Sequence, residues 1–260
     1  MIDIADRFVT VAPTQQNALD IFKDEWSSAM PAATGFTTQP GHAGLFQDPR
    51  IVWMEQKLGS VRGSIVLELG PLEGGHTYMI EKMGAKSVLA IESNQRAYLK
   101  CLIIKEAFDL KVSRFLLGDF NHYLQATKEP VDIIVASGVL YHMTDPVALL
   151  ESMARLSKNV MIWTHYYDEE AINKRPDLAH KFAAPQIIRK DHVVGRSSVQ
   201  SYYDALEWAG FSGGTAPTSV WLEKKLILDL LELFGFREVF VEFDQPDHPN
   251  GPAFAVCAKR

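Results

Sequence analysis

The stretch VLELGPLEGGHT at residues 66–77 sets the fold expected of this chain. It begins as a short apolar run, carries an acidic residue at Glu68, and breaks into a turn with Gly70, Gly74 and Gly75 before a helical pattern. Glycines permit a tight turn and let a ligand approach the backbone, and a helix start offers unpaired N–H groups. A strand, a glycine-bearing loop and a helix in this order predict the edge of an α/β sheet where a nucleotide-like ligand binds.

Strand-like and helix-like segments alternate around this stretch. Five short apolar runs recur at residues 64–69, 87–91, 113–117, 131–136 and 159–164. Apolar residues at helical spacing fill the intervals, and this alternation is typical of a parallel sheet covered on both faces by helices. A helical pattern at 221–234 and two strand-like runs at 237–243 and 253–258 bring the expected sheet to seven strands.

Two regions flank the expected sheet. Residues 1–60 contain one helical pattern from Thr14 to Met30 and another that begins after Asp48, so they predict a helical cap. Residues 61–260 then form the main domain, which is interrupted at about 165–220 by an irregular, substrate-facing insertion rich in aromatic and histidine residues. We therefore expect a doubly wound, mostly parallel, seven-stranded Rossmann-like α/β fold with an N-terminal helical cap and an insertion after strand five.

Composition restricts the partners and the cellular setting. The chain has 260 residues, is 47% hydrophobic and carries a net charge of −6, whereas a protein whose main partner is nucleic acid usually has a basic face. No apolar run approaches the length of a membrane span. Residues 1–6 show no secretory pattern, and Cys101 and Cys257 form no C-x-x-C pair, so we expect a cytoplasmic protein with reduced thiols. The sequence gives no signal for the oligomeric state.

Glu92 follows the second expected strand. It lies about 20 positions beyond the glycine loop, a spacing that suits hydrogen bonding to ribose hydroxyls. The alternative is that Glu92 only ends the strand and caps the next helix.

The glycine loop resembles motif I of the class I S-adenosylmethionine (SAM) methyltransferases. The usual form of that motif is (D/E)-x-G-x-G-x-G. Here the order Glu68, Gly70, Pro71, Leu72 and Gly74 gives E-x-G-x-x-x-G, with Leu72 near the place of the middle glycine. A dinucleotide-binding loop would require G-x-G-x-x-G, so this spacing disfavours a nicotinamide-dependent dehydrogenase.

A second stretch, ASGVLYHMTDP at residues 136–146, carries a narrower resemblance. It looks like the G-V-L-Y-H-x-x-D-P motif of methyltransferases related to the tRNA wobble-uridine carboxymethyltransferase, and HPNGP at 248–252 is a matching C-terminal signal. The resemblance covers roughly residues 44–164 and the last forty. It implies the methyltransferase fold and SAM as the cofactor, with S-adenosyl-L-homocysteine (SAH) as the product. It implies little about the acceptor.

The resemblance also implies roles for individual residues. Asp119 would accept a hydrogen bond from the adenine amine and Phe120 would lie near the ring, although a helix cap and a core residue are compatible alternatives. Arg50 would pair with the methionyl carboxylate of SAM, unless it is a solvated residue of a helix turn. The other cofactor-binding residues that we expect are Glu68, Gly70, Pro71, Gly74, Glu92, Ser93, Ser137, Gly138 and Tyr141.

Methyl transfer from a sulfonium is an in-line displacement, so the protein must mainly align the acceptor and exclude water. A base is needed when the acceptor is a hydroxyl. His142 and His165 are the candidates, because each follows the end of an expected strand and histidine can take a proton near neutral pH. His142 could instead pack beside the cofactor, whereas the polar aromatic cluster that begins at His165 favours acceptor contact. No second spaced cluster of ligands supports a metal site.

Together these patterns predict a SAM-dependent methyltransferase that acts on a small-molecule or saccharide-like acceptor, at oxygen. One alternative is transfer of a methyl group, or of a carboxymethyl group from carboxy-SAM, to tRNA. Another is a methyltransferase-like binding subunit without turnover.

Overall fold

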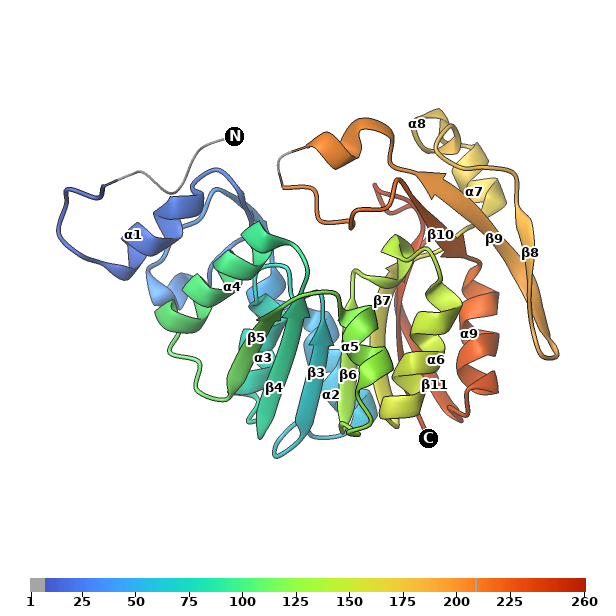
Figure 1. The fold of residues 1–260 in the computed structure, drawn as a ribbon, viewed down its shortest axis with the longest axis horizontal. Coiled ribbons are helices and arrows are strands. Elements are labelled where there is room, and N and C mark those ends of the chain that lie inside the picture. The colour runs from blue at the N-terminus through green and yellow to red at the C-terminus, as the bar shows by residue number, and fades with distance from the viewer. Residues whose placement is uncertain (1–7, 209) are drawn as a thin grey trace.

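The computed structural model describes residues 8–208 and 210–260 (Figure 1). The strands of its central sheet, in chain order, are β3 (Ile65–Leu69), β4 (Ser87–Glu92), β5 (Ser113–Leu117), β6 (Ile133–Ser137), β7 (Asn159–His165), β11 (Glu238–Gln245) and β12 (Ala253–Lys259). They lie in the order β11-β12-β7-β6-β3-β4-β5. Strand β12 is antiparallel to both neighbours, and the pairs from β7 to β5 are parallel. The expected doubly wound, mostly parallel seven-stranded sheet is confirmed.

The strand order places a topological switch point between β3 and β6. Val66 of β3 pairs with Val88 of β4 on one side and with Ile133 of β6 on the other. The chain moves from β3 outward through β4 to β5 and then returns to β6, so the loops after β3 and β6 diverge from adjacent strands. Gly70 has φ +66°, and a Cβ there would lie 2.6 Å from Val139 Cγ1. The two loops approach so closely that glycine is required.

Helices cover both faces of this sheet. The longer ones are α2 (Pro49–Leu58), α3 (Gly75–Lys82), α4 (Gln95–Ala107), α5 (Phe120–Ala126), α6 (Pro146–Leu156) and α9 (Lys224–Leu233). Apolar residues of α5, α6 and α9 form one core with Leu67, while those of α2 and α3 form another with Val66, because successive strand side chains point to opposite faces. Among the described residues, no helix has the length and apolar character needed to cross a membrane.

The N-terminal segment is only partly helical. Its elements are α1 (Gln15–Leu19), η1 (Asp20–Phe22), β1 (Trp26–Ser28), η2 (Ala32–Thr34), β2 (Pro40–Ala43) and η3 (Leu45–Gln47). Thr14 caps α1 as expected. The prediction of one helix from 14 to 30 is wrong beyond Phe22, because Asp24 takes φ +67° and Trp26 enters a strand. Residues 1–7, which include the whole stretch 1–6 that shows no secretory pattern, lie outside the described residues, and the domain boundary at residue 60 stays a prediction.

A buried carboxylate ties this segment to the glycine loop. Glu73 accepts hydrogen bonds from the backbone N–H groups of Ser27 at 2.9 Å and Ser28 at 2.8 Å, and from Lys100 Nζ of α4 at 2.8 Å. Glu73 is 1% and Lys100 is 7% exposed. The N-terminal segment therefore lies against the loop that follows β3, at the β4–β5 end of the sheet (Figure 1).

The insertion contains a sheet of its own, so the expectation of an irregular region is wrong. Its elements are α7 (Glu169–Asn173), α8 (Pro176–Ala179), β8 (Gln186–Lys190), β9 (Val193–Ser201), η5 (Tyr203–Glu207) and β10 (Thr218–Leu222). The strands are antiparallel in the order β10-β9-β8 and lie beside α9 (Figure 1). Gly195 lets β9 pack on α9, since a Cβ there would lie 2.8 Å from Leu226 Cβ. The helix expected from residue 221 begins at Lys224, because Trp221 and Leu222 pair with β9.

Replacing Glu73 should destabilise the protein strongly. Glu73→Ala leaves Lys100 as a buried charge without its partner carboxylate, together with two N–H groups, and we expect a loss of about 3–5 kcal/mol in the free energy of unfolding. Urea denaturation measures it. Glu106→Ala, an exposed position on the same helix as Lys100, is the control and should change stability by no more than about 0.5 kcal/mol. Equal unfolding free energies for the two variants would contradict the anchoring role of Glu73.

Candidate functional site

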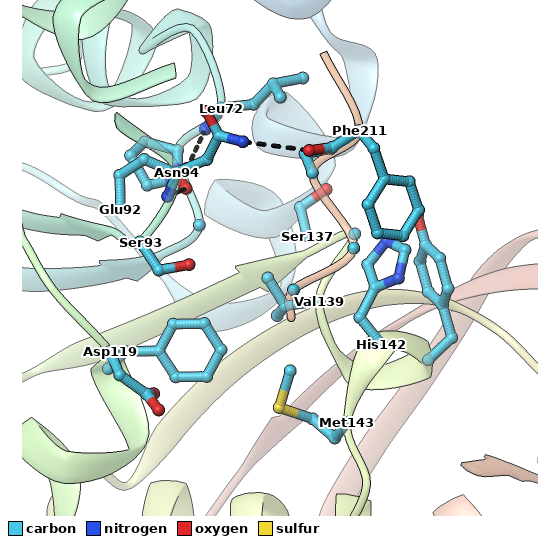
Figure 2. A pocket seen from close by; sticks show the side chains of 18 of the residues that line it. Leu72, Glu92, Ser93, Asn94, Asp119, Ser137, Val139, His142, Met143 and Phe211 are labelled. Carbon is cyan, nitrogen blue, oxygen red and sulfur yellow. Dashed lines mark hydrogen bonds between the residues drawn. The ribbon is translucent and has the colours of Figure 1, made fainter. Parts of the chain in front are cut away.

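A cavity of about 820 Å³ lies at the switch point. Its walls are the loops after β3, β4, β5 and β6, the start of α2, and residues 211–216 of the insertion, which we call the strap. Side chains from these separate segments face one hollow (Figure 2). Most of the expected cofactor-binding residues line it: Arg50, Gly70, Pro71, Glu92, Ser93, Asp119, Phe120, Ser137, Gly138 and Tyr141. Glu68 and Gly74 do not line it.

Glu68 and Gly74 act behind the cavity wall. The Thr77 hydroxyl donates to Glu68 Oε2, so this buried carboxyl fixes the first turn of α3, and burial raises its pKa. Gly74 has φ +76° and immediately precedes α3. Leu72 itself takes φ +55°, a conformation that favours glycine, so the absent middle glycine of the motif leaves a leucine with a left-handed backbone.

Glu92 joins the two loops beside the cavity. Its Oε2 accepts from the Leu72 N–H at 3.1 Å, and its Oε1 accepts from the Asn94 N–H at 2.8 Å. Burial raises the pKa of Glu92, while these backbone N–H groups act in the opposite direction. The carboxylate lines the cavity, where its remaining lone pairs can accept hydrogen bonds from hydroxyl groups of a ligand.

Asp119 and Phe120 combine the two roles that the sequence left open. Asp119 accepts from the Asn121 N–H at 2.8 Å and caps α5. Phe120 is 7% exposed and belongs to the core under α5 and α6. Both residues nevertheless line the cavity. At the same end of the cavity, Asp119 offers a hydrogen-bond acceptor and Phe120 offers an aromatic surface.

Arg50 is held in place, not solvated. Its Nε lies 2.9 Å from Asp48 Oδ1, its guanidinium lies 4.6 Å from the centre of the Trp163 ring, and its side chain is 17% exposed. His76 Nε2 is 2.8 Å from Asp48 Oδ2. Burial raises the pKa of Asp48, but hydrogen bonds and charges from His76 and Arg50 outweigh it and hold the pKa well below its ordinary value. Arg50 is thus a fixed cation in the cavity wall.

His142 faces the cavity from η4 (Leu140–His142). Its Nδ1 lies 2.6 Å from the hydroxyl of Tyr202, which follows β9. Burial lowers the pKa of His142 to about 4, and the nearby His165 adds to this effect. The imidazole is therefore neutral near pH 7 and can accept a proton.

His165 lies behind the cavity wall. It is 4% exposed, its Nδ1 is 2.8 Å from the Gly251 carbonyl oxygen, and its ring stacks on Trp221 at 5.1 Å. The Tyr141 ring, which does line the cavity, lies 4.6 Å from the imidazole. Of the two histidines proposed from the sequence, His142 faces the cavity and His165 supports its wall. His165 is expected from the sequence to contact the acceptor, but its side chain does not line the cavity.

Three long-range contacts of the site are not predicted from the sequence. Asn94 Nδ2 donates to the Phe211 carbonyl oxygen at 3.0 Å and so fastens the strap across the cavity (Figure 2). The Tyr202 hydroxyl lies 2.6 Å from His142 Nδ1, and the Arg50 guanidinium lies 4.6 Å from the centre of the Trp163 ring. The glycines of the strap indicate a loop. Composition cannot show that this loop contacts a residue more than 100 positions away in the sequence.

The arrangement suits a ligand with hydroxyl groups at one end and an anionic group at another. Glu92 and Asp119 offer acceptors, Arg50 offers a cation, and His142 lies where a proton could be taken. Within residues 8–208 and 210–260, no three His, Cys, Asp or Glu side chains are grouped as a metal site requires.

Comparisons with known proteins agree with this geometry. A family described as "Methyltransferase domain" matches residues 60–210. Among solved structures, the N-terminal domain of EvdMO1 with SAH bound has a TM-score of 0.65 at 19% identity over 94% of each chain. The Synechocystis PCC 6803 magnesium protoporphyrin IX methyltransferase with bound SAH has a TM-score of 0.55 at 13% identity over 82% of this chain and 81% of its own.

A third neighbour was solved with its acceptor. It is the Burkholderia thailandensis 1,6-didemethyltoxoflavin-N1-methyltransferase with 1,6-didemethyltoxoflavin and SAH, at a TM-score of 0.54 and 13% identity over 84% of this chain and 78% of its own. The present chain spans 46% of the full EvdMO1 chain. At these identities the likeness establishes a shared fold. No curated protein sequence matches the chain. The finer resemblance to relatives of the tRNA wobble-uridine carboxymethyltransferase stays a prediction.

The buried His165 should make stability depend on pH. Burial lowers its pKa from 6.5 to about 4, against the opposing effect of the backbone carbonyls, so the folded protein binds this proton less readily than the unfolded chain. Its contribution to stability is complete above pH 6.5 and is lost as the pH falls toward 4, by about 1.4 kcal/mol per pH unit. Urea denaturation at pH 6.0 and 5.0 should show a smaller fall for His165→Gln than for the wild type. The exposed His192→Gln should keep the wild-type fall, and the same fall in all three proteins would contradict the assignment.

Proposed function

The chain belongs to the methyltransferase domain family, and we propose that it transfers a methyl group from SAM to an oxygen atom of a small-molecule or saccharide-like acceptor. SAM is the cofactor and SAH the product, as in the SAH-bound neighbours. The observation that carries the acceptor proposal is the neutral His142 imidazole in the wall of the cavity that also contains Glu92 and Arg50.

The residues that line the cavity support a binding mode for the whole cofactor. We assign the Glu92 carboxylate to the ribose hydroxyls, Asp119 and Phe120 to the adenine, and Arg50 to the methionyl carboxylate. The cavity wall between these contacts is formed by Ser93, Ser137, Gly138 and Tyr141. Pro71 follows Gly70 at the turn after β3 and also lines the cavity. When bound, SAM supplies an electrophilic methyl group on a sulfonium. The remaining task of the chain is to align the acceptor behind that methyl and to exclude water.

His142 is the base in this proposal. A hydroxyl that attacks a methyl group becomes strongly acidic as its oxygen gains positive charge, so a neutral imidazole can take the proton even with a lowered pKa. His165 touches Tyr141, which adjoins His142, and we assign it a positioning role.

A small acceptor suits the site better than a nucleic acid. One neighbour, the N-terminal domain of EvdMO1, was crystallised in the presence of SAH and D-fucose, and another holds 1,6-didemethyltoxoflavin. The present chain has a net charge of −6, which opposes a polyanionic partner. We place the acceptor between the N-terminal residues up to 60 and the insertion at about 165–220. The two free, buried cysteines suit the reducing cytoplasm.

Calorimetric titration with SAM and SAH tests the cofactor site. We expect both to bind, and Glu92→Gln to weaken SAH binding by about 10-fold to 100-fold, because a charged acceptor of ribose hydrogen bonds is lost. Glu106→Gln, at an exposed position, is the matched control. If the wild type binds neither SAM nor SAH, the proposed function is wrong.

Incubation with SAM and a panel of free monosaccharides, deoxysugars and phenols tests the reaction. SAH release and NMR of the product should show an O-methyl group, and His142→Gln should abolish its formation while leaving SAH affinity unchanged. Methylation of nitrogen alone, or of tRNA but no small molecule, would contradict the acceptor proposal.

Arg50 can be tested by comparing two ligands that share an adenosyl group. Arg50→Met should weaken SAH binding by about 10-fold to 100-fold through loss of the carboxylate contact. Binding of 5′-methylthioadenosine, which lacks the amino-acid part, should be unchanged. The exposed Arg62→Met is the control. If both ligands weaken equally, Arg50 supports the wall and does not pair with the carboxylate.

A further inference from the structure

We infer that His76, the second residue of α3, is a positioning residue that orients Arg50 through the Asp48 carboxylate and so serves the amino-acid end of the cofactor. The inference rests on the proposed function, because it concerns the arginine that we assign to the methionyl carboxylate. His76 lines the cavity and lies 28 positions from Asp48 in the sequence.

The packing of α3 against the segment before α2 brings His76 to Asp48. Gly75 begins α3, and a Cβ there would lie 2.7 Å from the carbonyl carbon of Leu45 in η3. The Asp48 N–H donates to Met79 Sδ of α3 at 3.2 Å. His76 and Asp48 are both buried, and the imidazole Nε2 lies 2.8 Å from Asp48 Oδ2. The glycine at the start of the helix therefore permits the contact between the histidine and the aspartate.

The chemistry of Asp48 fixes the direction of this hydrogen bond. An aspartate carboxyl is ionised near pH 7, and an ionised carboxylate can only accept hydrogen bonds. Burial acts to raise the pKa of Asp48, but the hydrogen bonds and charges of His76 and Arg50 hold it below its ordinary value. His76 Nε2 therefore carries a proton and donates it, whether the ring is neutral or cationic.

Glu68 lies on the other side of the imidazole. Its Oε1 is 4.0 Å from His76 Nδ1, and its Oε2 accepts a hydrogen bond from the Thr77 hydroxyl. The ring therefore lies between a carboxyl of β3 and the carboxylate at the start of α2. Turning the ring away from Asp48 would leave that buried carboxylate with Arg50 as its remaining side-chain partner.

Asp48 in turn determines which edge of Arg50 a ligand meets. The Nε and Nη2 groups of Arg50 both donate to Asp48, with Nε 2.9 Å from each carboxylate oxygen, and Nη1 has no hydrogen-bond partner within residues 8–208 and 210–260. A guanidinium presents five N–H groups in a fixed fork. The edge formed by Nη1 and Nη2 is left for a bidentate contact with a ligand carboxylate.

NMR of ligand-free protein labelled with ¹⁵N-histidine and ¹⁵N-arginine tests this arrangement. Two-bond ¹H–¹⁵N correlations, assigned with His76→Gln, should show a proton on His76 Nε2 at pH 7. The Arg50 Nε–H, assigned with Arg50→Met, should exchange with water about 3-fold to 10-fold faster in His76→Leu, because the carboxylate that holds it loses a hydrogen bond. His76→Gln, whose amide N–H can replace Nε2–H, should keep the wild-type rate, as should the exposed His192→Leu.

A neutral His76 ring protonated on Nδ1 alone would overturn the inference. So would an Arg50 Nε–H exchange rate that is the same in His76→Leu and the wild type.

Calorimetry with two ligands supplies a second measurement. His76→Leu should weaken SAH binding by about 3-fold to 10-fold, while His76→Gln keeps the wild-type affinity. Binding of 5′-methylthioadenosine should not change in either variant, which also shows that both are folded. In an Arg50→Met background, His76→Leu should cause no further loss of SAH affinity, because its effect passes through Arg50.

Equal weakening of the two ligands by His76→Leu, or a full additional loss in the Arg50→Met background, would overturn the inference. Failure of the proposed function is a different result, in which the wild type binds neither SAM nor SAH. In that case the NMR measurements, which need no ligand, decide whether His76 orients Arg50.

Discussion

The carboxylate of Glu92 is the contact on which the architecture of the site depends. By accepting from the Leu72 and Asn94 N–H groups, it joins the loop after β3 to the loop after β4. The loops after β3 and β6 are joined differently, by a close approach that permits no side chain at Gly70. Three strand ends are thus fixed with respect to one another, and the cavity follows from their spacing.

Interactions that are local in sequence could be predicted, and long-range ones could not. The strands of the central sheet and the caps by Thr14, Asp48 and Asp119 follow from hydrophobic periodicity and motif spacing, and most of the cofactor-binding residues expected from the motifs line the cavity. The end of the first helix was missed because Asp24 adopts a left-handed backbone, to which no proline or glycine nearby draws attention. Strand β9 was missed because its serines and glycine resemble a loop, and its pairing with β8 and β10 decides its structure.

The two histidines show the same limit within the site. Both follow strand ends, and the sequence favours His165 for contact with the acceptor. The structure separates them by what lies around each ring: His165 is fixed between Trp221 and the Gly251 carbonyl, whereas His142 meets a residue of the insertion and the cavity. The insertion therefore contributes a side chain, Tyr202, to the surroundings of His142, and residues 211–216 to the cavity wall.

The strap has a consequence for turnover. The Asn94 side-chain amide donates a neutral hydrogen bond to the Phe211 carbonyl oxygen, and the Phe211 ring lies 5.0 Å from the Tyr202 ring. Such a hydrogen bond contributes about 0.5–1.5 kcal/mol. Loss of that hydrogen bond would change the equilibrium constant for displacing the strap from the cavity by about 2-fold to 12-fold, since 1.4 kcal/mol corresponds to a factor of 10. Residues 211–216 line the cavity and belong to no strand, so displacing them would open the cavity to a ligand without separating any strand of either sheet.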